Sequence, residues 1–232
     1  MTVRYNHNQK KSVYFDGSTN YLKAAAGSAG KANLNPQGDE AFSITMWVLP
    51  QRAAGTREFL YTKAQNSSPY DGIYVEFTAA KEIMFRFYTN SSGTANGINV
   101  PSFVNVTRDI KDGWNMIGCS YDGSEAISGG KVYLNGVDVS VTGSATGTPA
   151  NMSAGTTATP HEAIIAALYG YSSNRFLGSV CAVAFWQTEL TAAQMEEVYL
   201  GAGTRPGPGD LTYHSQYANL VSWWISDHAS DS

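Results

Sequence analysis

Short apolar segments, some continuous and some alternating with polar residues, recur about ten times along this chain. Gly, Asn, Asp and Ser separate them, which is the pattern of antiparallel strands joined by turns. The segment at residues 42–49 ends at Pro50, which has no amide hydrogen for pairing within a central strand. We therefore expect an all-β protein with strands near residues 12–15, 42–49, 58–62, 73–77, 83–88, 114–121, 163–169 and 180–186.

The clearest local signal is a hairpin at residues 131–140. Asn135-Gly136 lies at its centre and favours the two positive φ angles of a type I′ turn. Residues 142–160, in contrast, are rich in Gly, Ser, Thr, Ala and Pro and show no hydrophobic period. The pattern predicts a tight hairpin followed by a long exposed loop.

One short helix is predicted near the C-terminal end of the β-rich region. Thr191 is its N-cap, and Gln194 stands at the third helical position, where it completes a capping box. Gly201 follows the last helical residue and favours termination. These signals predict a helix over residues 192–200.

A change of composition near residue 203 divides the chain. Residues 203–209 read Gly-Thr-Arg-Pro-Gly-Pro-Gly, which is typical of a linker. We expect one domain over residues 1–202, of which 1–11 form a short N-terminal arm. The remainder, residues 203–232, is predicted to be a linker followed by a C-terminal docking tail.

Composition agrees with an all-β fold and excludes one class of partner. Only 15% of the 232 residues are charged, against about 25% in an average soluble domain, and Gly (23) and Tyr (14) are abundant. Such a composition suits strands and turns better than Glu- and Lys-rich helices. The net charge is -4 and the longest basic run is Lys10-Lys11, so we expect no nucleic-acid partner.

Membrane insertion and secretion are not expected either. No apolar run approaches the roughly 18 residues of a transmembrane helix, and the first residues lack the apolar core of a signal peptide. Cys119 and Cys181 both lie in apolar segments. In a chain made in reducing cytoplasm, they are expected to be buried free thiols.

Enzymatic activity is not expected, because the residue patterns of common hydrolases are missing from the sequence. A β-sandwich glycosidase needs two carboxylates on one strand face, and no alternating acidic array occurs. Glu76 and Glu82 are interpreted as solvent-facing carboxylates. His161-Glu162 resembles the start of a zinc protease motif, but Ile165 stands where the second His is needed. We expect no catalytic residues and no required cofactor.

Loops that combine tyrosine with amide side chains are candidates for sugar binding, although such tyrosines also occur as core rims with hydrated hydroxyls. The candidate glycan-binding residues are Tyr70, Asp71, Tyr88, Asn90, Tyr171, Asn174 and Arg175. Calcium is a further candidate ligand, because Asp71 and Asp122 lie in Asp-Gly turns that offer oxygen atoms. The alternative is that each Asp only shapes its turn.

Six segments occur in a characteristic order: residues 12–22, 42–50, 113–123, 130–137, 176–186 and 190–199. This order resembles that of laminin G-like, concanavalin A-like jelly-roll domains. The resemblance implies an antiparallel jelly-roll sandwich of two curved sheets with one short C-terminal helix, and a role in adhesion more than in catalysis. Cys181-Ala182 departs from the acidic pair that the family often has there, so no polar or metal role is carried over to these positions.

The segment 219–228 resembles one that follows laminin G-like domains in bacteriophage virion proteins. This resemblance implies a non-enzymatic structural protein, either a capsid decoration or a tail or fibre component, assembled in host cytoplasm and displayed on the particle surface. Other virion subunits are then the expected partners, in a homo-oligomer or a capsid or tail lattice. Trp223, Trp224 and Ile225 are the candidate anchor, unless they cover the domain's own sheet.

A second hypothesis is a carbohydrate-binding module of a non-viral adhesin or of a polysaccharide-degrading system. It would bind glycans through the loop tyrosines, and the displayed virion domain would bind host or environmental glycans in the same way. Glycan binding is therefore common to both hypotheses, and association with a particle separates them.

Overall fold

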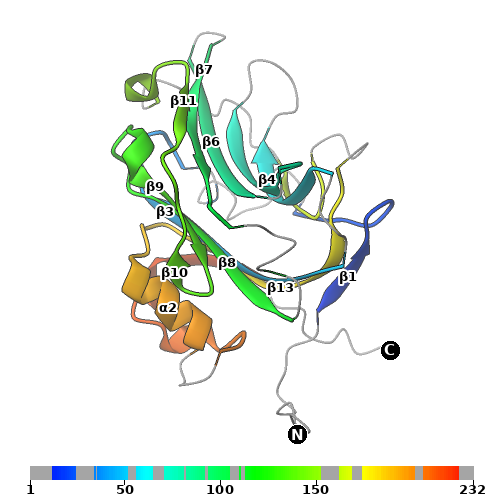
Figure 1. Ribbon diagram of the computed structural model, residues 1–232. Coiled ribbons are helices and arrows are strands. Elements are labelled where there is room, and N and C mark those ends of the chain that lie inside the picture. The colour runs from blue at the N-terminus through cyan, green and yellow to red at the C-terminus, as the bar shows by residue number, and fades with distance from the viewer. Residues whose placement is uncertain are drawn as a thin grey trace, which may run out of the picture.

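A computed structural model describes residues 12–24, 34, 36–51, 56–64, 71–80, 82–91, 94–104, 110, 113–152, 162–168, 174–201 and 206–224. Within these ranges the chain forms two seven-stranded antiparallel sheets that face each other (Figure 1). Sheet 1 has the order β1 (Val13–Asp16), β13 (Leu177–Trp186), β3 (Phe42–Pro50), β8 (Asn115–Tyr121), β9 (Gly130–Leu134) and β10 (Val137–Asp138), with β14 (Leu220–Trp224) also paired to β13.

Sheet 2 and the helices complete the described structure. Sheet 2 has the order β11 (Ser144–Thr146), β7 (Thr94–Pro101), β6 (Ile83–Ser91), β5 (Gly72–Phe77), β4 (Glu58–Ala64), β12 (Ala163–Ile165) and β2 (Leu22–Ala24). The helices are α2 (Ala192–Leu200) and the short 3₁₀ turns η2 (Ile127–Gly129), η3 (Pro149–Asn151), η4 (Leu211–Tyr213) and η5 (Tyr217–Asn219). This is the antiparallel β-sandwich that the strand pattern predicts, and it agrees with the jelly roll that the family resemblance implies.

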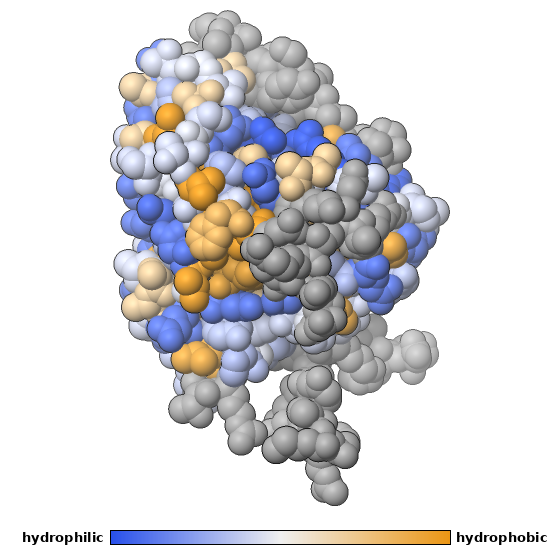
Figure 2. Space-filling model, viewed as in Figure 1, coloured by the Kyte–Doolittle hydropathy of each residue, from blue (hydrophilic) through white to orange (hydrophobic). Residues whose placement is uncertain are grey.

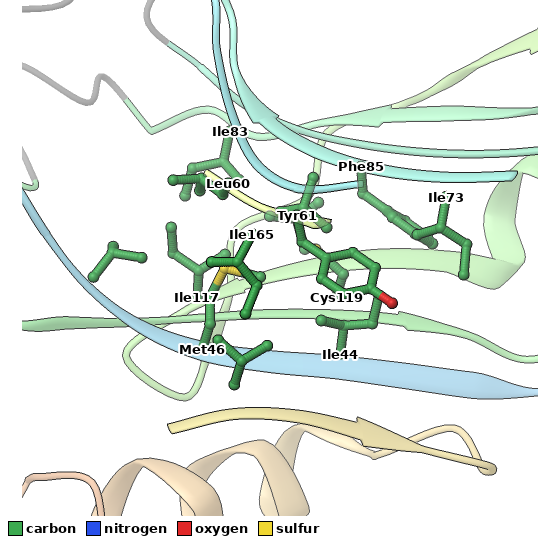
Figure 3. Close-up of a cluster of buried hydrophobic side chains, with 14 of the residues drawn as sticks. Ile44, Met46, Leu60, Tyr61, Ile73, Ile83, Phe85, Ile117, Cys119 and Ile165 are labelled. Carbon is green, nitrogen blue, oxygen red and sulfur yellow. The ribbon is translucent and has the colours of Figure 1, made fainter. Parts of the chain in front are cut away.

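Alternation along each strand sends every second side chain into the space between the sheets. Figure 3 shows the resulting cluster, in which residues such as Ile44, Phe85 and Ile117 meet from both sheets. Phe42 stacks on Phe185 with ring centroids 5.7 Å apart, and both residues come from sheet 1. Such burial of apolar surface is the main term that holds the two sheets together.

The outer face of sheet 1 has a second apolar cluster. It is covered by α2 and by residues 206–224, which we call the C-terminal segment (Figure 1). Met195 and Val198 of α2 are buried in this cluster. Trp47 of β3 stacks on Tyr199 with ring centroids 5.6 Å apart. Met195 packs closely on β8 at Gly118, where a Cβ would lie 2.6 Å from Met195 Sδ.

β14 belongs to the sandwich, in contrast to the separate docking tail expected at residues 203–232, of which residues 203–205 and 225–232 lie outside the described part of the chain. β14 pairs with β13 from Leu220↔Trp186 to Trp224↔Val183. β1 pairs with the other half of the same β13 edge, from Val13↔Val180 to Asp16↔Leu177. The first and last described strands therefore lie end to end along one edge of sheet 1.

Most local predictions are confirmed. Asn135 and Gly136 have φ values of 54° and 82°, as the type I′ hairpin requires. α2 has the predicted bounds, and the Thr191–Gln194 capping box is present. Gly201 adopts the left-handed conformation that ends the helix. Both cysteines are buried free thiols.

Four strands were missed by the sequence interpretation: β2, β7, β11 and the β14 strand described above. β7 reads Thr-Ala-Asn-Gly-Ile-Asn-Val-Pro, in which the polar residues and the glycine conceal the alternation of Ile98 and Val100. The expectation of a long exposed loop over residues 142–160 is wrong at β11, which pairs with β7, and residues 153–160 lie outside the described part of the chain. Pairing to a neighbouring strand decides these segments, and local propensity does not encode it.

The surface of the described part of the molecule mixes polar and apolar groups. Figure 2 shows hydrophobic atoms in orange among blue and white ones on the face in view. Large exposed apolar side chains include Phe103, Val137 and Val141. Among the described helices, α2 included, none has the length and apolar character needed to cross a bilayer.

The hydroxyl of Tyr61 generates a stability prediction. Tyr61 is fully buried, Figure 3 shows it extending from β4 into the core cluster, and its hydroxyl has no hydrogen-bond partner among the residues that the structure describes. Burial of an unpaired hydroxyl costs about 1–3 kcal/mol. Tyr61→Phe is therefore expected to raise the free energy of unfolding by about 1 kcal/mol, and Tm by about 2–4 °C, in denaturant and thermal melts.

Tyr121 supplies the matched control for that substitution. Its hydroxyl donates to the Gly38 carbonyl at 2.8 Å and accepts from the Glu125 amide at 2.7 Å. Tyr121→Phe is expected to lower stability, because it leaves these two groups without their partner. If Tyr61→Phe destabilises the protein as much as Tyr121→Phe does, the account of the Tyr61 hydroxyl is wrong.

The Cys119 thiol generates a pH prediction. Burial raises the pKa of Cys119 far above the value of about 8.5 that an unfolded chain would show. Between about pH 8.5 and 10 the unfolded state therefore loses a proton that the folded state keeps, so stability falls as pH rises, by about 1.4 kcal/mol per pH unit. Urea unfolding across this range should show a shallower decline for Cys119→Ala; equal slopes in the two proteins would contradict the prediction.

Candidate functional site

The outer face of sheet 2 is the second large face of the sandwich, and α2 lies on the opposite side of the molecule (Figure 1). Ile73 and Val75 of β5 point into the core cluster, so Tyr74 and Glu76 between them point outward. Register places Tyr74 beside Arg86 of β6, and Arg86 beside Asn99 of β7. Polar and aromatic side chains from three neighbouring strands thus share this face.

An aromatic cluster forms one part of the face. The ring centroids of Phe59 and Tyr74 lie 6.3 Å apart, and those of Tyr74 and Tyr88 lie 5.8 Å apart. These three rings are 1%, 5% and 8% exposed, respectively, and form a satellite apolar cluster with Ala64. The three rings therefore form the buried base of this face. They are too little exposed for a sugar to stack flat on them.

A charged group lies beside the aromatic cluster. The Glu76 side chain is fully buried, and its carboxylate accepts Nε–H of Arg86 at 2.9 Å and Nε–H of Arg57 at 2.5 Å, each on a different oxygen. The side chains of Arg57 and Arg86 are 42% and 25% exposed. We call these three residues the arginine pair site. The carboxylate holds two guanidinium groups side by side at the surface.

Further hydrogen bonds fix Arg86 in this arrangement. Its Nη1 donates to Asn99 Oδ1 at 2.8 Å and to the Tyr88 hydroxyl at 3.3 Å, and that hydroxyl donates to Asn99 Oδ1. Asn99 in turn donates from Nδ2 to Thr146 Oγ1 at 3.1 Å. Partial burial lowers the pKa of Arg86, but the Glu76 charge and the Tyr88 contact outweigh this effect and raise it overall. Arg86 is a rigid, permanently charged donor.

The glycan candidates named from the sequence occupy separate places. Tyr88 and Asn90 lie on β6, and Tyr88 is buried with its hydroxyl bound to Asn99, unlike an exposed stacking platform. Asn174 is exposed, and Arg175 donates to the Ser18 carbonyl and lies 5.7 Å from the Tyr21 ring. Asp71 is 1% exposed. Tyr70 and Tyr171 lie outside the described residues.

The calcium candidates do not form a binding site in the described part of the chain. Asp71 is buried at the start of β5, away from the exposed rim position expected of a turn ligand. Asp122 is exposed, and its Oδ1 accepts the Ser124 amide at 2.8 Å, the contact of a residue that shapes its own turn. Among the described residues, no group of three or more His, Cys, Asp or Glu side chains could hold a metal ion.

The tryptophans proposed as a subunit anchor lie on β14 within sheet 1. Trp223 packs on the outer cluster beneath the C-terminal segment, and Trp224 packs on the core cluster, 6.5 Å from the Tyr61 ring between centroids. Both are half-buried by this chain alone. Ile225 lies outside the described residues. These contacts correspond to the alternative that the two rings cover the domain's own sheet.

Sequence reasoning missed the arginine pair site. The available signal was Arg86 inside the apolar strand Ile-Met-Phe-Arg-Phe-Tyr, at a position whose alternation points outward. Glu76 lies diagonally across from Arg86 on the preceding strand, where its register partner is Met84, and it was interpreted as a solvent-facing carboxylate. The structure corrects this, because Glu76 is fully buried beneath two guanidinium groups.

Solved structures show the same fold at low sequence identity. A Bacteroides ovatus protein considered to bind carbohydrate has a TM-score of 0.57 and 14% identity, over 95% of this chain and 52% of that protein. The CBM40 domain of a Ruminococcus gnavus sialidase, solved with α2,6-sialyllactose, has a TM-score of 0.54 and 12% identity, over 82% of this chain and 97% of that domain. The chain thus spans about half of the Bacteroides protein.

A viral structure is also similar. The enzymatically active domain of tailspike protein 2 from bacteriophage CBA120 has a TM-score of 0.51 and 12% identity, over 97% of this chain and 34% of that one. At such identities the likeness concerns the fold alone. No curated protein matches the sequence.

The family comparison is more direct. A laminin G sequence model, described as the concanavalin A-like lectin/glucanases superfamily, matches residues 16–196. The match covers well over half of the chain and the strands of both sheets from β2 to β13. The chain therefore belongs to the concanavalin A-like lectin/glucanases superfamily, as a laminin G-like member.

Proposed function

We propose that this chain is a non-enzymatic glycan-binding domain displayed on the surface of a bacteriophage particle. The observation that carries the glycan-binding part is the arginine pair site with its hydrogen-bonded partners Tyr88 and Asn99. Guanidinium and amide groups fixed on a sheet face are suited to bind sugar oxygens, because their geometry is set before the ligand arrives. The opposite outer face is closed by α2 and the C-terminal segment.

The structural neighbours support this assignment. They include the Bacteroides protein considered to bind carbohydrate and the sialidase domain solved with sialyllactose. The tailspike neighbour supports the placement on a phage particle, together with the resemblance of residues 219–228 to virion proteins. A virion protein would be assembled in the host cytoplasm beside other virion subunits.

The chemistry of Glu76 supports a binding role over hydrolysis. Glycoside hydrolysis uses two carboxyl groups, one of them a proton donor. Both oxygens of Glu76 accept from arginine and its side chain is fully buried, so this carboxylate is not open to a substrate. A measured turnover of any glycan that the protein binds would contradict the non-enzymatic part of the proposal.

A non-viral carbohydrate-binding module is the second candidate. It is favoured by the sialidase domain, because this chain covers 97% of that binding module. The two candidates predict the same binding face and differ in where the protein is found.

Glycan binding at the outer face of sheet 2 can be tested by steric blockade. Ser144 is exposed on β11, at the end of the row that includes Arg86 and Asn99. Ser144→Trp is expected to lower glycan-array signals at least tenfold. Ala193→Trp, at an exposed position of α2 on the other side, should leave them unchanged. Equal signals for both variants would place the binding elsewhere, and no signal from the unsubstituted protein would refute glycan binding.

Particle association can be tested by mass spectrometry of purified virions. If the proposal is correct, the chain appears in phage particles in a fixed ratio to the major capsid or tail protein and remains there after density-gradient purification. Immunogold labelling should then place it on the outside. Its absence from particles whose genome encodes it would leave the carbohydrate-binding module as the remaining assignment.

A further inference from the structure

The arginine pair site carries a more specific inference, which rests on the proposed glycan binding. We infer that its ligand is an acidic saccharide, whose oxyanion binds between the guanidinium groups of Arg57 and Arg86. Carboxylate and sulfate are two oxyanions that occur on sugars. The carboxylate is the better match, because a planar guanidinium fork donates two parallel hydrogen bonds to it.

The donor groups of both arginines support this inference. Glu76 takes only the Nε–H of each residue. Among the described residues, the terminal nitrogens Nη1 and Nη2 of Arg57 and Nη2 of Arg86 have no hydrogen-bond acceptor. Each guanidinium therefore keeps unpaired N–H groups at a position that is partly open to solvent.

The charge balance favours an anion. Two arginines share one carboxylate, so the site keeps one positive charge in excess. Because Glu76 is fully buried and Arg86 is mostly buried, the site is less hydrated than an exposed pair would be. Electrostatic attraction is stronger in such surroundings than in bulk water.

The arrangement is also held in place before any ligand binds. The Arg57 guanidinium carbon lies 4.6 Å from the centroid of the Phe59 ring, a cation–π contact. Arg86 is fixed by Asn99 and Tyr88 on the side away from its free Nη2. Little side-chain entropy is therefore lost on binding.

The test compares matched glycans on the intact chain. The probes are α2,6-sialyllactose, lactose 3′-sulfate and lactose by titration calorimetry, together with an array of acidic glycans paired with their carboxyl-reduced forms. We expect the acidic member of a pair to bind at least tenfold more tightly, which is about 1.4 kcal/mol. The preference should weaken as salt is raised. A preference for sulfate over carboxylate would identify a sulfated saccharide as the ligand.

Variants identify the residue that provides the preference. Arg57→Gln removes one guanidinium group and leaves the Arg86–Glu76 ion pair. We therefore expect the acidic probe to bind at least tenfold more weakly and its neutral partner to bind unchanged. Arg57→Lys should restore part of the loss, since it keeps the charge without the fork. Lys131→Gln on β9 removes a charge from sheet 1 and should change affinity less than twofold. Thermal melts verify that each variant is folded.

The outcomes separate this inference from the proposed function. Equal affinity for acidic and neutral partners, or an equal loss in Lys131→Gln, overturns the acidic ligand and leaves glycan binding intact. No binding to any glycan on the array overturns both.

Discussion

Strand β13 must be buried on both of its faces, and the rest of the sandwich satisfies that requirement. From Val180 to Trp186 its residues are buried without interruption. Val183 and Phe185 face sheet 2, whereas Ala184 and Trp186 face the cluster beneath α2. Removing α2 would expose the second set, so the helix is part of the fold and not an appendage. The outer face of sheet 2 differs, because it carries ionic and hydroxyl groups that tolerate water.

Much of the fold could be predicted because its strongest signals are local. The Asn135-Gly136 turn and the Thr191 cap each depend on residues within a few positions of one another. The missed strands β7 and β11 depend on partners, since each is stabilised by pairing with the other. The tail at Leu220–Trp224 was misjudged for a related reason: a Pro- and Gly-rich connection precedes it, although its partner strand lies in the domain.

The candidate site was less predictable than the fold. The sequence pattern pointed to loops for sugar ligands, whereas Glu76 and Arg86 of the arginine pair site lie on strands and Arg57 directly precedes β4. Arg57 and Glu76 are 19 positions apart, and Arg86 is 10 positions from Glu76. No short motif contains such a set, and only the pairing of β4, β5 and β6 brings it together. Tyr88, a glycan candidate from the sequence, lies in this region, where its hydroxyl contacts Asn99 and Arg86.

The end-to-end placement of β1 and β14 on one edge of β13 has a consequence for chain connectivity. Both strands run antiparallel to β13 and therefore point in the same direction. Together they form a single edge strand from two distant parts of the sequence. The pairing at this edge of β13 therefore does not depend on the order in which β1 and β14 occur in the sequence. A circular permutant that opens at the Asn135-Gly136 turn, with a linker joining the present ends, would keep every strand beside its present neighbour.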